Sequence, residues 1–294
     1  MLSELRRSGF IERPTNPWLA VLLAPIVSIL GSVAGFFILE ALPRSSGAVG
    51  FALDLVAFFM PVAFLIWIWR LRVERGDLSS LGLARTRGLM RFGRGFGIGF
   101  LLFSTVVGGL RLLGMIGPDP TPMAVTGGSA VGALLIVLGG WVVQASTEEL
   151  VARGWLMSTL SARTSVPIAV IVSSLLFALL HILNQNVSVL AMANIMLVGL
   201  FLAVYAIVEG GIWGVAGIHT AWNFAQANVF GLEVSGNEVS VGTLWDLEEA
   251  GPGLWTGDFF GPEAGLVATF VISLALAAIV LRMRQAGTAE GQLR

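Results

Sequence analysis

Long apolar stretches alternate with short polar connections along the whole chain. Each stretch holds about 20 residues, which is the length that an α-helix needs to cross a bilayer. The pattern predicts eight membrane-spanning helices, at residues 17–42, 50–71, 96–116, 130–160, 167–184, 187–207, 210–230 and 264–283. We therefore expect an all-α polytopic membrane protein, with residues 1–294 forming a single transmembrane domain.

Composition supports the same fold class. The chain is 56% hydrophobic and only 12% charged, which is too little charge to cover the surface of a soluble domain. The apolar stretch at 17–42 is too long for the core of a signal peptide, so it counts as the first span. The absence of cysteine excludes disulfides, thiolate metal sites and cysteine nucleophiles.

The arginines are divided unevenly between the two sides of the expected bundle. Eight spans put both ends of the chain on one side, and that side carries fourteen arginines against two on the other. The fourteen are Arg6, Arg7, Arg13, Arg70, Arg72, Arg75, Arg85, Arg87, Arg91, Arg94, Arg163, Arg282, Arg284 and Arg294. Because arginine-rich connections stay in the cytoplasm, we expect a multi-pass cell-membrane protein with both termini and the connection 72–95 cytoplasmic. The acidic connection 231–263 is then extracytoplasmic.

Three charges interrupt the fourth span, within the segment QASTEELVARGW at residues 144–155. A Glu or Arg near the membrane centre costs about 2.5–3.5 kcal/mol, whereas each Leu, Ile or Val returns only about 0.3–0.6 kcal/mol. This helix is therefore expected to turn its charges toward other helices or toward a polar cavity inside the membrane. Glu149 and Arg153 are four residues apart and can pair on one face. Glu148 points about 100° away from Glu149 and is left free to act as a general base or acid.

The chain has two histidines, and both lie in predicted spans. Glu148 and His181 each lie fifteen residues from the connection between their spans, so they should sit at the same depth on antiparallel neighbours. His219 is followed four residues later by Asn223, on the same helix face. Phe177 is interpreted as a packing residue. A carboxylate, two imidazoles and an amide can activate water and hold an oxyanion, which is the chemistry of amide hydrolysis.

Other intramembrane protease signatures are missing from the sequence, which contains no HExxH zinc motif, no serine flanked by glycines and no Gly-x-Gly-Asp. Zinc is nevertheless left open as a cofactor, because Glu148, His181 and His219 form a two-His, one-carboxylate donor set. Against zinc, Asn223 is a poor metal ligand and a good hydrogen-bond donor. The favoured hypothesis is a water activated by glutamate, with no tightly held metal ion, and zinc is the alternative.

Four segments resemble a known family: EELVARGWL, SSLLFALLH, HTAWNF and GPEAGL. They are similar to the CPBP family of intramembrane endopeptidases, which is related to the type II CAAX prenyl protease. The family motifs EExxxR, FxxxH and HxxxN fall on Glu148, Glu149 and Arg153, on Phe177 and His181, and on His219 and Asn223. The resemblance covers residues 130–283 and implies a helical fold with a cavity in the bilayer. It also implies that Glu148 and His181 activate water, and that His219 and Asn223 hold the oxyanion.

The expected function is therefore that of an intramembrane endopeptidase that cuts a membrane-anchored protein or peptide, lipidated or not. Glu149 and Arg153 are expected to support its catalytic site. The first alternative is a non-catalytic membrane partner or a bacteriocin-immunity-type protein of the same fold. A proton-coupled transporter is a further alternative, because Glu/His chains also serve as proton relays, although no inverted repeat is evident. The expected partners are the substrate and the lipid bilayer, with no nucleic acid, and the oligomeric state is left open.

Overall fold

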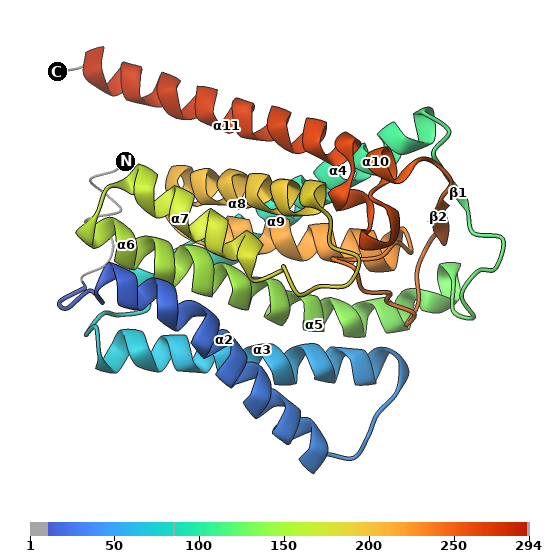
Figure 1. Cartoon of the computed structure of the whole chain (residues 1–294), viewed down its shortest axis with the longest axis horizontal. Coiled ribbons are helices and arrows are strands. Elements are labelled where there is room, and N and C mark those ends of the chain that lie inside the picture. Colours follow the sequence, from blue (N-terminus) through green and yellow to red (C-terminus); the bar gives the residue numbers. More distant parts are fainter. Residues whose placement is uncertain (1–10, 85, 293–294) are drawn as a thin grey trace.

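The computed structural model describes residues 11–84 and 86–292, with side chains described up to Gln285. Four of the arginines that support the expected orientation, Arg6, Arg7, Arg85 and Arg294, lie outside the described residues. All eight apolar stretches form helices, and the molecule is a bundle of roughly parallel and antiparallel helices (Figure 1). The main helices are α2 (Pro17–Ala41), α3 (Gly47–Arg72), α4 (Gly88–Leu112), α5 (Val131–Glu149), α6 (Ser158–Arg163), α7 (Val166–Leu179), α8 (Val189–Glu209), α9 (Trp213–Phe224) and α11 (Leu266–Gln292).

Six helical segments within the described residues are long and apolar enough to cross a membrane, so this is an all-α polytopic membrane protein. They are Pro17–Ala41, Gly47–Arg72, Gly88–Leu112, Gly127–Arg163, Val189–Glu209 and Leu266–Gln285. The other two expected spans are shorter than predicted. The helix expected at 167–184 ends at Leu179 after 14 residues, and α9 has 12 residues before it widens into the π-helical turn Ala225–Val229.

Polar residues set several helix ends. Asn16, Ser165 and Ser188 each accept a hydrogen bond from a backbone N–H in the first turn of α2, α7 and α8, respectively. Helix α8 ends at Glu209 and is followed by Gly210, whose φ of 74° is the left-handed conformation that glycine adopts readily at a helix C-terminus. The residues 180–186 that follow α7 form turns and a bend.

Helix α9 lies in the interior, packed against α4, α5 and α8. Its contact with α4 is very close, since a Cβ added at Gly95 or Gly99 would collide with the backbone of Gly214 or Ile218. The sequence predicts such a helix-packing face at Gly95 and Gly99, and the structure confirms it. His219 and Asn223 lie on another face of α9, where they meet Glu149 and Gln144 of α5.

The fourth span is a composite of α- and π-helical segments and not one regular α-helix. Between α5 and α6, the segment Leu150–Met157 forms a π-helical stretch of 8 residues, all of them buried. Such π-turns often occur at functional sites, because the extra residue in the turn redirects the side chains around it. This stretch begins directly after Glu148 and Glu149, and it contains Arg153.

The two connections of interest lie at opposite ends of the bundle. Figure 1 shows the connection between α3 and α4 at the end where α2 begins and α11 finishes, and the connection between α9 and α11 at the other end. Helix α4 begins at Gly88, so Arg91 and Arg94 belong to a helix and not to the connection expected at 72–95.

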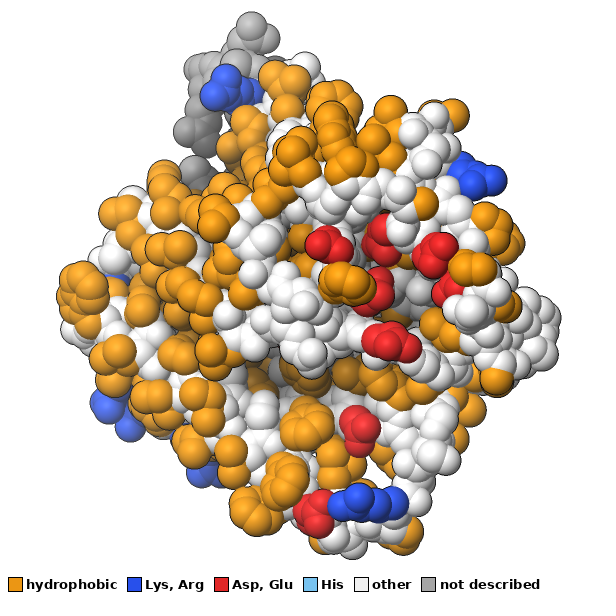
Figure 2. Space-filling model, turned by 45° about the vertical axis from the view of Figure 1, so that its right-hand side comes forward, with side chains coloured by type: hydrophobic (Ala, Val, Ile, Leu, Met, Phe, Trp, Pro, Cys, Tyr) orange, Lys and Arg blue, Asp and Glu red, His pale blue; other side chains and the backbone are white. Residues whose placement is uncertain are grey.

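The acidic connection 231–263 contains regular secondary structure. Its strand β2 (Leu247–Glu249) pairs with β1 (Ile116–Pro118), and it also contains the short helix α10 (Gly253–Thr256). Figure 2 shows carboxylate side chains gathered at this end of the molecule. Hydrogen bonds across the segment, such as Gly236 N–H to the Phe260 carbonyl at 3.0 Å, fold it back over the ends of the helices.

Candidate active site

A buried ion pair lies at the centre of the polar cluster. An oxygen of Glu149 accepts a hydrogen bond from Arg153 at 2.7 Å, and both side chains are fully buried. The guanidinium of Arg153 also donates to the backbone carbonyl of Gly199 on α8 at 3.1 Å. Its central carbon lies 4.4 Å from the centroid of the Phe177 ring on α7. The pair expected from the four-residue spacing is present, and Phe177 packs against its cation.

The same oxygen of Glu149 also binds His219, a contact that the sequence did not predict. His219 Nδ1 lies 2.9 Å from Glu149 Oε1, and its Nε2 lies 3.7 Å from Glu148 Oε2. A carboxylate can only accept, so Nδ1 must carry the proton that is shared with Glu149. This contact fixes the ring with Nε2 facing Glu148, much as a second carboxylate orients histidine in other enzyme sites.

Glu148 is bound through one oxygen only. Its Oε1 accepts a hydrogen bond from Gln144 at 2.7 Å, whereas its buried Oε2 has no hydrogen-bond partner among the described residues. Gln144 in turn accepts a hydrogen bond from Asn223 at 3.0 Å. Gln144 was overlooked in the sequence, although it is the one amide in the apolar run before Glu148 and lies four residues earlier on the same face.

His181 lies beyond the end of α7, in a turn and not in the helix expected there. Its Nδ1 is 2.8 Å from the carbonyl oxygen of Phe177. Because a carbonyl only accepts, Nδ1 carries the proton and Nε2 is left as the acceptor of the neutral ring. Within the described part of the chain no hydrogen bond joins His181 to Glu148, but both side chains line one cavity.

This cavity has a volume of about 840 Å³ and brings all four expected catalytic residues together. Glu148, His181, His219 and Asn223 lie on its polar side. The opposite side is formed by α2 and α3, whose lining residues are mostly apolar and include Phe36, Phe51 and Phe59. The segment 234–239 of the acidic connection closes one end. A polar wall facing an apolar wall suits a peptide that is itself anchored in the membrane.

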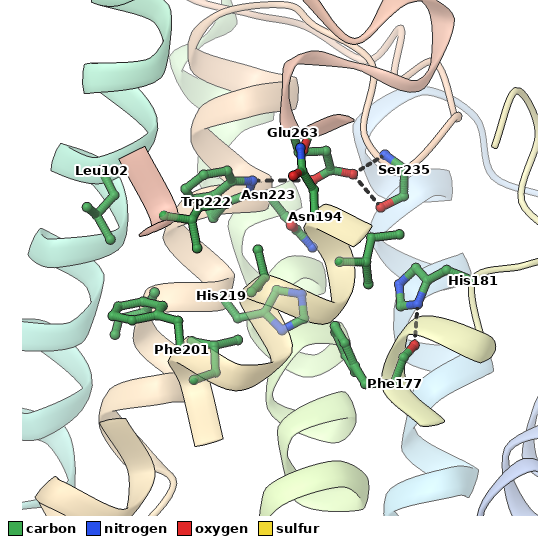
Figure 3. A pocket seen from close by; sticks show the side chains of 15 residues that line it. Leu102, Phe177, His181, Asn194, Phe201, His219, Trp222, Asn223, Ser235 and Glu263 are labelled. Atoms are coloured by element: carbon green, nitrogen blue, oxygen red, sulfur yellow. Dashed lines mark hydrogen bonds between the residues drawn. The ribbon is translucent and has the colours of Figure 1, made fainter. Parts of the chain in front are cut away.

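A second, smaller cavity of about 50 Å³ shares Phe177, His181 and His219 with the large one (Figure 3). Its polar end is formed by Glu263, which was also overlooked as a candidate side chain although it lies in the quoted segment GPEAGL. Glu263 accepts hydrogen bonds from the Ser235 backbone N–H at 2.8 Å and from Trp222 Nε1 at 3.3 Å. Burial raises the pKa of the Glu263 carboxyl, an effect partly offset by these donors and by His181.

The zinc donor set considered from the sequence is not assembled. Among the residues that the structure describes, no three carboxylate or imidazole side chains lie close enough to hold one metal ion. Glu148 and His219 face each other, but His181 is directed to the Phe177 carbonyl and Asn223 to Gln144. The donor geometry therefore fits hydrogen-bond chemistry better than a four-coordinate metal centre.

Comparison with known proteins identifies the segment that carries this site. Residues 130–225 match the family model described as "Type II CAAX prenyl endopeptidase Rce1-like". No curated protein and no solved structure matches the chain. The matched segment contains every residue of the three sequence motifs, so the resemblance inferred from them is confirmed.

The buried ion pair can be tested against an exposed pair with the same spacing. Glu149→Gln leaves Arg153 buried without a counter-charge, so we expect the free energy of unfolding to fall by about 3–5 kcal/mol. The control is Glu40→Gln, because Glu40 binds Arg44 at 3.0 Å with side-chain exposures of 52% and 88%. That variant should lose less than about 1 kcal/mol. Unfolding of the purified proteins in SDS measures both, and equal losses would contradict a structural role for the buried pair.

Proposed function

Since residues 130–225 carry the Rce1-like segment, and its polar side chains line a cavity among apolar helices, we propose that this protein is an intramembrane endopeptidase. The family match supports a CAAX-type intramembrane protease. The proposed substrate is a protein or peptide anchored in the membrane, and the reaction is hydrolysis of one of its peptide bonds. The observation that carries the proposal is the free oxygen of Glu148, buried and facing His219 across 3.7 Å.

A water molecule is the natural partner for this oxygen. Polar atoms 3.7 Å apart are too far for a direct hydrogen bond, but a bridging water can bind both. In the proposed first step, Glu148 Oε2 takes a proton from water while the water oxygen attacks the carbonyl carbon of the scissile bond. His181, with its proton held at Nδ1 by the Phe177 carbonyl, offers Nε2 as an acceptor for the second hydrogen of that water.

The oxyanion formed by this attack needs donors. Arg153 balances only one of the two glutamates, so a protonated His219 would balance the other and present Nε2–H to the cavity. Asn223 supplies the second donor, because only one of its two amide hydrogens is needed for the bond to Gln144. When the tetrahedral intermediate collapses, the C–N bond breaks and the proton held by Glu148 passes to the leaving amine.

The catalytic assignment predicts how variants should act on a reconstituted enzyme. Quenched-fluorescent peptides, farnesylated and unmodified, would be offered to the protein in liposomes. Glu148→Gln and His181→Ala should each lower the rate by about 10²–10⁴, and the double variant should be little slower than either alone. Asn223→Ala should lower it by about 10²–10³.

The matched control for this series is Glu238→Gln, which removes an exposed carboxylate from the rim of the same cavity. It should retain full activity. Full activity in Glu148→Gln would exclude Glu148 as the base. If the wild-type protein cleaves none of the peptides, a non-catalytic partner of the same fold is favoured instead.

We also propose that both termini face the cytoplasm. Support comes from the arginine-rich connection and the acidic connection lying at opposite ends of the bundle, together with the preference of arginine for the cytoplasmic side.

The orientation can be tested by labelling, because the chain contains no cysteine of its own. Leu78 and Ser240 are exposed and lie in the two opposite connections. In intact cells a membrane-impermeant maleimide should label Ser240→Cys, and it should label Leu78→Cys only after permeabilisation. Labelling of both variants in intact cells would contradict the eight-helix topology, and the reverse pattern would invert the orientation.

A further inference from the structure

We infer that Gln144 is a positioning residue that orients the catalytic base and the oxyanion donor as one unit. This inference rests on the proposed function, because it assigns a role within that site. Gln144 lies on α5 one turn before Glu148, and Asn223 faces it from α9. The side chains of Gln144 and Asn223 are 7% and 6% exposed, so solvent cannot replace their contacts easily.

The directions of these hydrogen bonds are determined by Glu148. An ionised carboxylate can only accept, so Gln144 must present its NH₂ group to Glu148 Oε1, at 2.7 Å. The amide oxygen of Gln144 then faces Asn223 and must accept from it, at 3.0 Å. Asn223 is thereby held with its NH₂ group toward α5. An unbound Asn223 could rotate its amide by 180° and present its oxygen, which would repel an oxyanion.

The contact also selects which oxygen of Glu148 reacts. With Oε1 occupied by Gln144, the unpartnered Oε2 is the oxygen available to water, and it is the one that faces His219. Gln144 therefore binds Glu148 through Oε1, the oxygen that does not react with water. It binds Asn223 through the amide hydrogen that does not face the oxyanion. A single side chain couples both groups, although it touches neither the water nor the substrate in this scheme.

The π-helical turn after α9 supplies a comparable contact with α5 that includes none of the four proposed catalytic residues, although Trp141 also lines the large cavity. Trp141 donates from its ring N–H to Asn228 at 2.7 Å, and Asn228 donates to the Gly242 carbonyl at 3.0 Å. Asn228 is fully buried, like the residues around Gln144. The two contacts have similar burial and similar bond lengths, but only the one at Gln144 reaches Glu148. They separate a structural effect from a catalytic one.

The test compares Gln144→Met with Asn228→Leu in the full-length protein in liposomes. Gln144→Met keeps the length of the side chain and loses both hydrogen bonds. We expect kcat on the fluorescent peptides to fall about 10–100-fold with KM unchanged, since small misplacements of reacting groups cost up to about 10²-fold. Asn228→Leu should lower stability while leaving kcat of the folded protein within about twofold. Adding Gln144→Met to Asn223→Ala should cost less than Gln144→Met alone, because one of the two groups that Gln144 orients is then already missing.

An infrared measurement detects the hydrogen bond between Gln144 and Glu148 without any substrate. The carboxylate band of Glu148 is obtained as the difference between the spectra of the wild type and Glu148→Gln. Loss of the Gln144 donor should shift that band in Gln144→Met and leave it unchanged in Asn228→Leu. An unshifted band, or a kcat no lower than that of Asn228→Leu, would overturn the inference. If no peptide is cleaved by the wild type, the proposed function fails and the band alone decides whether Gln144 positions Glu148.

Discussion

The buried ion pair between Glu149 and Arg153 is the interaction on which the rest of the site depends. A charge inside a membrane is tolerated only where it is paired and enclosed. Arg153 meets this condition through Glu149, through the Gly199 carbonyl of α8 and through the Phe177 ring of α7. Glu149 meets it through Arg153 and through His219 of α9. The ion pair on the fourth span therefore contacts three other helices, α7, α8 and α9. It also orients His219 so that its Nε2 faces Glu148.

Around this pair the regular helices are interrupted where the site requires it. The π-helical stretch Leu150–Met157 follows the glutamates directly, and α7 stops at Leu179 so that His181 lies in a turn. Non-helical backbone at membrane depth is acceptable only if it is buried in protein or lines a wet cavity. Here the segment 234–239 of the acidic connection covers that turn, with Asn184 donating to the Ser235 carbonyl at 3.0 Å. The acidic connection 231–263 is thus part of the cavity wall. Its last residue, Glu263, lines the smaller cavity.

The sequence was informative about contacts along one helix and weak about contacts between helices. All eight apolar stretches are helical, and the four-residue spacing of Glu149 and Arg153 predicted their pairing. The bond between His219 and Glu149 joins residues 70 positions apart, and no periodicity reports such a contact. The early end of α7 was missed because the apolar pattern continues past it, to Leu183. Gln144 could have been found by the same spacing rule, since it lies four residues before Glu148.

The central claim is that Glu148 activates water to cut a membrane-anchored substrate. The most direct test compares the membrane proteomes of cells that produce either wild-type protein or Glu148→Gln, with the new peptide ends identified by mass spectrometry in ¹⁸O-labelled water. The account predicts at least one membrane protein whose shortened form appears only with the wild type and carries ¹⁸O in its new carboxyl terminus. Identical sets of peptide ends in the two strains, with both proteins present at equal levels in the membrane, would contradict it.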